Sequence, residues 1–319
     1  MNVFYFIIQQ TMFFFIPLLI VALGAMFSER SGVVNIALEG IMIMGAFVSI
    51  LFINLVQKGG KLSGQPLLIF AVLIAALSGG IFSLLHAYAA VNMKADQVIS
   101  GTALNMFAPA FAIFIARTLQ GMQQIHFFDD FRIPAVPILS KIPLLGKMFF
   151  TNAYITTYIG IAILIASVII MNKTKFGLRL KSCGEHPQAA DSVGINVGRI
   201  RYSGVIISGM LAGIGGLVFV IPTSTNFNAE VAGYGFLALA VLIFGQWRPM
   251  RILLAALFFG IMKTISVTYE AIPFLYSSGL PDNVYKMIPF IATLIVLAFT
   301  SKSSQAPTAS GKPYEKGER

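Results

Sequence analysis

The chain has 319 residues, of which 57% are hydrophobic and only 11% are charged, and its mean hydropathy is +0.84. A soluble domain of this length would carry far more charge on its surface, so the composition excludes a soluble globular protein. The formal net charge of +10 does not indicate nucleic-acid binding, because the basic residues gather in loops between apolar runs, without interleaved aromatic side chains.

Nine apolar runs are predicted to cross or enter a membrane, because about 20 apolar residues in a helix span its hydrocarbon core. The predicted fold class is therefore all-α, a polytopic transmembrane helix bundle of about nine spans, with eight or ten as alternatives. The second run is interrupted by Asn35, Glu39 and Gly40, and the seventh is short, so either could be a broken or re-entrant helix. In chain order the runs are Phe4–Phe27, Val33–Val56, Pro66–Val91, Val98–Gln120, Ala153–Asn172, Arg201–Pro222, Ala232–Gln246, Pro249–Tyr269 and Val284–Thr300.

Polar segments divide the chain into one transmembrane domain, residues 1–300, and a tail at 301–319 that is rich in Ser, Pro, Gly and Lys and is predicted to be disordered. The loop 121–151 is predicted to be external. Basic residues concentrate in the loop 173–200, in the turn at 248–251 and in the tail. The positive-inside rule places these three segments, and with them the C-terminus, in the cytoplasm.

Few residues within the runs could carry chemistry. The sequence has no G-x-x-x-x-G-K-[ST] loop, so the chain is not expected to hydrolyse ATP, and any pumping must be powered by a gradient or another subunit. An ion-coupled secondary transporter would use Glu39 or Lys263, although Glu39 is equally expected to cap a broken helix. A membrane enzyme would need convergent acids or a metal site, and His86, His126 and His186 lack ligand spacing. No catalytic residue or metal ligand is predicted.

Small residues recur inside the runs, at Ser78–Gly80, Ser100–Thr102 and Ser208–Gly216. They favour close packing of helices, which replaces the hydrophobic driving force that lipid removes. A polar path through the bundle is the alternative interpretation, since asparagine side chains can offer both donors and acceptors to a solute. The single cysteine, Cys183, excludes an intrachain disulfide and a cysteine-based metal site.

Three segments carry a family resemblance: SERSGVVNIALEGIMIMGAF at Ser28–Phe47, KADQVISGTALN at Lys94–Asn105 and GLRLKSCGEHPQAADSVGINVGRIRYSGVIISGMLAGIGG at Gly177–Gly216. They resemble the permease subunits of binding-protein-dependent ABC importers, in the branch for ribose, branched-chain amino acids and nucleosides. The first segment is closest to the nucleoside or simple-sugar permeases, and the chain length fits the shorter of their two permeases.

This resemblance implies a multi-pass permease subunit of the bacterial cytoplasmic membrane that moves nucleosides by alternating access, with ribose or another simple sugar as the alternative solute. It implies no enzymatic activity and no cofactor in this chain, because ATP and Mg would bind a separate ABC ATPase subunit. The other implied partners are a second, longer permease that would form a heterodimer, an extracytoplasmic solute-binding lipoprotein and membrane lipid. Nucleic acid is not among them.

In such importers a cytoplasmic loop with an E-A-A-x-x-x-G pattern docks on the ATPase, and the matching stretch here is Gln188–Gly194, with Gln188 where the pattern has Glu. Glu185, one turn earlier, could supply the carboxylate. Gly194 is expected to end the short helix in a left-handed turn. The predicted coupling residues are Gly184, Glu185, Gln188, Ala189, Ala190, Asp191 and Gly194. A nucleoside path needs polar groups for the ribose hydroxyls and an aromatic surface for the base. The residues predicted to line it are Asn35, Glu39, Asn105 and Phe107.

Overall fold

The computed structural model describes residues 3–60, 62–137, 139–143, 145–272, 275, 277, 281–300 and 306–316. The helices of the first half are α1 (Val3–Arg30), α2 (Leu38–Lys58), α3 (Gly64–Val91), α4 (Gln97–Gln120), η1 (Leu139–Lys141) and α5 (Leu145–Phe149). The helices of the second half are α6 (Ile155–Lys173), α7 (Lys175–Glu185), α8 (Pro187–Ser192), α9 (Val197–Thr223), α10 (Tyr234–Phe244), α11 (Pro249–Thr268), η2 (Tyr269–Ala271) and α13 (Asp282–Thr300). The predicted all-α bundle is confirmed.

Seven helices among the described residues are long and apolar enough to cross a membrane: α1, α2, α3, α4, α6, α9 and α11, the last with its η2 extension to Ala271. The predicted runs at Ala232–Gln246 and Val284–Thr300 correspond to α10 and α13, which are not among these seven. Helix α10 has only 11 residues, too few to cross the hydrocarbon core on its own. The count of nine spans stays a prediction.

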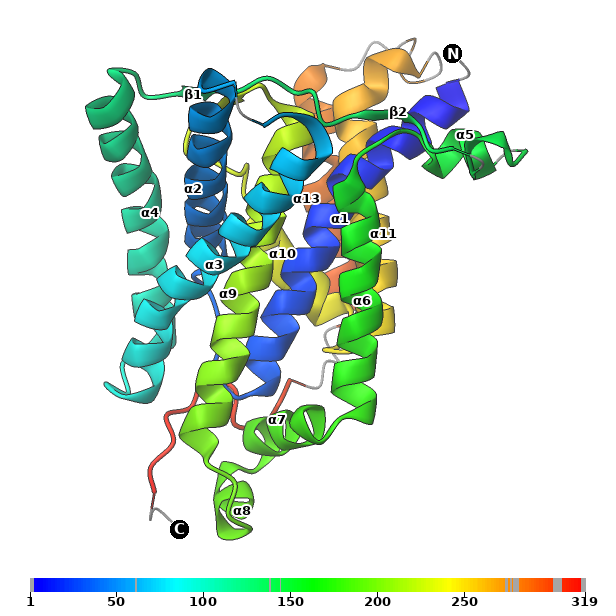
Figure 1. Ribbon diagram of the computed structural model, residues 1–319. Helices are drawn as coiled ribbons and strands as arrows, with labels where there is room; N and C mark the ends of the chain where they lie inside the picture. Colours follow the sequence, from blue (N-terminus) through cyan, green and yellow to red (C-terminus); the bar gives the residue numbers. More distant parts are fainter. Residues whose placement is uncertain are drawn as a thin grey trace.

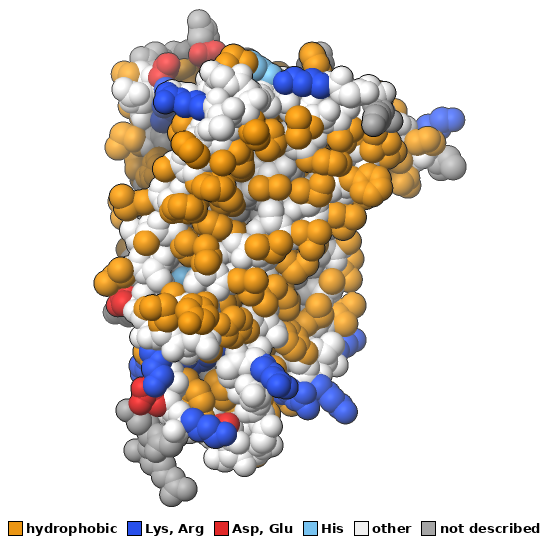
Figure 2. Space-filling model, turned by 60° about the vertical axis from the view of Figure 1, so that its left-hand side comes forward, with side chains coloured by type: hydrophobic (Ala, Val, Ile, Leu, Met, Phe, Trp, Pro, Cys, Tyr) orange, Lys and Arg blue, Asp and Glu red, His pale blue; other side chains and the backbone are white. Residues whose placement is uncertain are grey.

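The helices form an elongated bundle with two distinct ends (Figure 1). One end, here called the strand end, carries α5 and two small antiparallel pairings, β1 (Ile125–His126) with β4 (Asn226–Phe227) and β2 (Ile133–Ala135) with β3 (Thr151–Ala153). The opposite end, the α7–α8 end, carries α7, the projecting α8 and the C-terminal residues. Hydrophobic side chains cover the middle of the face in Figure 2, and most charged side chains lie toward its two ends.

Helix α9 lies at the centre of the packing, against α1, α2 and α3. A Cβ built on Gly213 of α9 would lie 2.2 Å from the Ala75 carbonyl oxygen of α3, and one on Gly45 of α2 would lie 2.3 Å from the Gly213 Cα. Only glycine permits this approach, so the small residues at these positions are confirmed as helix-packing residues.

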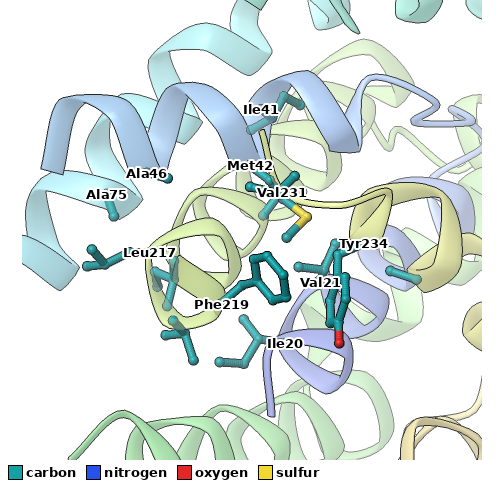
Figure 3. Close-up of a cluster of buried hydrophobic side chains, with 14 of the residues drawn as sticks. Ile20, Val21, Ile41, Met42, Ala46, Ala75, Leu217, Phe219, Val231 and Tyr234 are labelled. Carbon is teal, nitrogen blue, oxygen red and sulfur yellow. The ribbon is translucent and has the colours of Figure 1, made fainter. Parts of the chain in front are cut away.

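A cluster of large side chains fills the space beside this glycine contact (Figure 3). Phe219 of α9 packs on Tyr234, the first residue of α10, with 4.1 Å between the ring centroids. Ile20 and Val21 of α1 and Met42 of α2 lie around the two rings. The first turn of α10 is therefore embedded among α1, α2 and α9.

Candidate functional site

The predicted coupling residues lie together at the α7–α8 end, in the last turn of α7, along α8 and in the turn that follows α8 (Figure 1). Thr174 caps α7 through its side chain, which accepts from the Gly177 N–H, and Pro187 occupies the first turn of α8, where a missing N–H costs nothing. Gly194 adopts φ +81°, and the Ile195 N–H donates to the Ala190 carbonyl. The predicted left-handed turn at Gly194 is confirmed.

Helix α8 offers one buried face and one exposed face. Ala190 is 2% exposed and packs in a small cluster with Cys183 and Val197, and Tyr314 of the tail lies against that cluster. Gln188 and Ala189 are exposed, and Asp191 is half-buried. The exposed face is free, among the described residues, to receive another protein.

A polar cluster that the sequence did not predict joins this loop to the rest of the bundle; it comprises Glu29, Arg30, Glu185 and Trp247 and is here called the Arg30 cluster. The Arg30 guanidinium donates to the Trp247 carbonyl through Nε and Nη2, at 3.3 and 3.2 Å, and its Nη1 lies 3.4 Å from Glu185 Oε1. The Trp247 indole donates to Glu29 at 2.6 Å. Helix α7 also comes close here, because a Cβ on Gly184 would lie 2.3 Å from the Arg30 carbonyl oxygen.

The C-terminal residues 306–316 also lie on this loop, although their composition predicted disorder. The Ala309 N–H donates to Gly184, the Gly311 N–H donates to Gly32, and the Thr308 hydroxyl donates to Glu185 at 2.9 Å. Short polar segments are ordered when their backbone groups find partners in this way, and a local composition does not reveal such partners. Residues 301–305 and 317–319 lie outside the described part of the tail.

The four predicted path residues lie away from α8, and three of them lie around the first turns of α2 and α10. Residues 33–35 have no helical structure, and α2 then continues without a break from Leu38 through Glu39 and Gly40 to Lys58, so the second run forms one helix that begins at Leu38 instead of Val33. The Glu39 carboxylate, in the first turn of α2, accepts from the N–H groups of Gly233 and Gly235 at 2.9 and 2.6 Å. Glu39 therefore caps the positive N-terminal end of α10.

Asn105 of α4 makes hydrogen bonds to the backbone at the start of α2. Its Oδ1 accepts from the Gly40 N–H at 2.7 Å and its Nδ2 donates to the Ile36 carbonyl at 2.8 Å, so both ends of the amide are engaged. Asn35 is fully buried and donates to Ser208 of α9 at 2.9 Å, and its Oδ1 has no partner among the described residues.

Phe107 is separated from the other three by its orientation. It is 49% exposed on the outer face of α4, where it stacks on Phe82 and Phe111 with centroid distances of 6.2 and 5.4 Å. The structure thus brings Asn35, Glu39 and Asn105 into one region around the start of α2, while Phe107 lies on an exposed surface of α4.

Helix α10 connects the two regions. Its first residues lie beside Glu39, and the turn that follows its last residue carries Trp247 of the Arg30 cluster. Gln246 and Trp247 both have positive φ, +49° and +52°, which is strained for residues with a Cβ. The Arg30 and Glu29 side chains hold this strained turn.

Comparisons with known proteins agree with the resemblance noted in the sequence. The family model described as "Branched-chain amino acid transport system / permease component" matches residues 7–297. The guanosine ABC transporter permease protein NupQ of Bacillus subtilis (strain 168) is 43% identical, covering 98% of this chain and 97% of its own.

Two further relatives come from Lactococcus lactis subsp. cremoris (strain MG1363). The nucleoside ABC transporter permease protein NupC is 41% identical, covering 97% of this chain and 96% of its own. The nucleoside ABC transporter permease protein NupB is 27% identical, covering 95% of this chain and 84% of its own. No solved structure matches the chain.

Proposed function

This chain belongs to the family of permease components of the branched-chain amino acid transport type, and from that premise we propose that it is the shorter permease of an ATP-driven nucleoside importer. The observation that carries the proposal is the likeness, at 41–43% identity over nearly the whole chain, to two permeases named for guanosine and nucleosides. Ribose or another simple sugar is the less favoured solute, because neither of these two relatives is named for a sugar.

The proposed orientation places the α7–α8 end in the cytoplasm and the strand end outside. It is supported by the basic residues of α7, the 248–251 turn and the tail, which by the positive-inside rule are retained on the cytoplasmic side. In this orientation α8 presents Gln188 and Ala189 to a separate ABC ATPase, which would bind ATP and Mg. The chain itself has the role of a transport subunit and performs no covalent chemistry.

Transport in this proposal depends on α10, which links the α7–α8 loop to the region around the start of α2. When the ATPase closes, force on α8 reaches Glu185 and then Arg30, which holds the turn at Trp247. A shift of that turn moves α10 along its axis and changes the cap that Glu39 provides at its other end. The two positions of α10 correspond to the two conformational states of the permease, and the ATPase must bind these states with different affinities.

The solute would enter at the strand end, where a pocket of about 530 Å³ is lined in part by Asn54, Gln57, His126 and Asn226. An extracytoplasmic solute-binding lipoprotein is the proposed donor at this end. The path would continue toward Asn35, Glu39 and Asn105. Asn35 has an unpartnered Oδ1 among the described residues that could accept from a ribose hydroxyl.

A second, different permease is the proposed partner that completes the path. NupB and NupC, two permeases of the same organism, both resemble this chain, and the resemblance to NupB covers less of its length, as expected for a longer partner. The outward face of α4, with Phe107 and Met106 exposed, is the proposed contact surface for that subunit.

Uptake of radiolabelled guanosine tests the substrate class. Cells that lack this chain should lose uptake and regain it when the chain is restored, and excess unlabelled nucleoside should compete while excess ribose should not. Restored uptake that ribose abolishes would assign the permease to sugars. Uptake that persists in cells without the ATPase would contradict the ABC mechanism.

A further inference from the structure

A second pocket lies at the α7–α8 end and has no part in the proposed transport path. It has a volume of about 450 Å³ and opens between the end of α6, the second half of α7 and the turn before α11. Three cationic side chains, Arg30, Lys181 and Arg248, line it, and none of its described lining residues is acidic. Its chemistry is therefore that of an anion site.

The three cations are not neutralised within the pocket. Arg30 has one carboxylate partner, Glu185, which lies outside the pocket lining. Lys181 donates to the amide oxygen of Asn172 at 3.3 Å, a neutral partner. Burial, together with the charges of Arg30 and Arg248, lowers the pKa of Lys181, so the like charges already act on one another. An anion placed among them would relieve this repulsion.

Exposed apolar side chains beside the pocket favour a lipid over a free ion as its ligand. Ile169, Ile165 and Ile161 of α6 precede Asn172 by three, seven and eleven residues, so they form a strip on the helix face directly above it. All three side chains are exposed, at 47%, 55% and 44%. Met250, at the first turn of α11 on the other side of the pocket, is 57% exposed. A free phosphate would gain nothing from this apolar strip.

We propose that this pocket binds the phosphate headgroup of an anionic membrane lipid such as phosphatidylglycerol, whose acyl chains lie along the exposed isoleucines of α6. Basic pockets at the ends of transmembrane helices suit such headgroups, because each cation near the membrane surface contributes about 1 kcal/mol to the attraction of an anionic lipid. The beginning of α11 adds its partial positive charge to the same site.

The single tryptophan of the chain provides a local probe, because Trp247 also lines this pocket. The purified full-length chain is reconstituted into phosphatidylcholine vesicles that contain either phosphatidylglycerol with brominated acyl chains or phosphatidylcholine with the same brominated chains. Bromine quenches tryptophan fluorescence only at short range. We expect brominated phosphatidylglycerol to quench Trp247 at a lower mole fraction than brominated phosphatidylcholine; equal quenching would overturn the proposal.

Charge variants test whether the pocket causes the preference. Lys181→Gln and Arg248→Gln should each reduce the preference for phosphatidylglycerol about fivefold, which corresponds to about 1 kcal/mol per cation. Arg248→Lys, which keeps the charge, should retain it. Lys147→Gln removes the same charge from an exposed position on α5 at the strand end and should leave the preference unchanged. Unchanged quenching in both glutamine variants would overturn the proposal.

Two further outcomes distinguish other occupants. If inorganic phosphate, added to both sides of the membrane, abolishes the preference, the site binds a free anion and the lipid proposal is wrong. If the glutamine variants keep the lipid preference but lose the ATPase in pull-downs, the cations belong to a protein interface. Loss of the lipid preference with normal nucleoside uptake and ATPase binding leaves the transport proposal unaffected, and loss of uptake with an unchanged lipid preference leaves the lipid proposal unaffected, so the two proposals fail separately.

Discussion

Glu39 and Asn105 show how polar side chains are used inside this bundle. Both were predicted to line a solute path, and both make hydrogen bonds to backbone groups that an interrupted helix leaves without partners. An unsatisfied backbone group is costly in lipid, so a broken helix requires such a side chain. His86 serves similarly, since its Nε2 pairs with the Val34 carbonyl at 2.9 Å and its Nδ1 with Ser100.

The capping role of Glu39 predicts a loss of stability that depends on the replacement. Glu39→Ala should lower the free energy of unfolding by about 1–3 kcal/mol, because the Gly233 and Gly235 N–H groups lose their acceptors. Glu39→Gln should lower it less, because one carboxamide oxygen remains. Thermal unfolding in detergent measures both. If Glu39→Ala is as stable as the wild type but transports nothing, Glu39 contacts solute and its cap is incidental.

The glycine contact between α9 and its neighbours predicts a position-specific effect. Gly213→Ala should destabilise the chain by about 1–3 kcal/mol, because the added methyl group meets the Ala75 carbonyl at 2.2 Å and backbone cannot yield as a side chain does. Gly198→Ala, in the first turn of the same helix, is the matched control, since its nearest neighbouring atom would lie at 3.5 Å. Equal unfolding temperatures for the two variants would show that α3 and α9 are not packed this closely.

At the scale of elements, the α7–α8 loop and the C-terminal segment form one packed unit. Cys183 of α7 is fully buried under Ala190, Val197 and Tyr314, and burial raises the pKa of its thiol. The thiolate is the reactive form, so both burial and the raised pKa slow its modification. The cysteine therefore reports on whether the tail covers the loop.

Maleimide labelling of Cys183 makes this dependence measurable. In the intact chain, labelling at neutral pH should be slower than that of the denatured chain, and it should accelerate only as the pH rises above the ordinary thiol range, because a raised pKa keeps the thiol protonated longer. Truncation after residue 305, or Tyr314→Ala, should accelerate labelling at neutral pH. Unchanged labelling in the truncated chain would mean that residues 306–316 do not cover the loop.

The features that the sequence predicts are those determined by residues close together in the chain. Long apolar runs and the turn at Gly194 are local patterns, and the structure confirms seven of the runs as candidate membrane spans and confirms the turn. The Arg30 cluster joins residues more than 150 positions apart, and neither Arg30 nor Trp247 carries a local pattern that reveals its partner. The ordered tail was missed for the same reason, since its partners, Gly184 and Gly32, lie far away in the sequence.

At the scale of the whole molecule, the short helix α10 connects the Arg30 cluster at the α7–α8 end with the region around Glu39 in the interior. Helix α10 is held at its beginning by Glu39 and at its following turn by the Arg30 cluster, and between these points Ala238, Val241 and Leu242 are fully buried against its neighbours. A short helix packed in this way can slide by a small distance against its neighbours, which is the shear type of motion. In the proposed transport cycle, such a shift of α10 would leave the central packing of α9 in place.

The proposed docking of an ATPase on α8, which would drive solute import, is best tested by guanosine uptake in cells that carry variants of the exposed face of α8. Ala189→Glu and Gly194→Asp change exposed positions on or just after α8. Gly121→Asp is the matched control: Gly121 also has positive φ and open space around a built Cβ, but it lies at the strand end. With equal amounts of each variant in the membrane, the α8 variants should lose uptake and the ATPase in pull-downs, while Gly121→Asp keeps both. Wild-type uptake and ATPase binding in both α8 variants would show that α8 does not receive the ATPase.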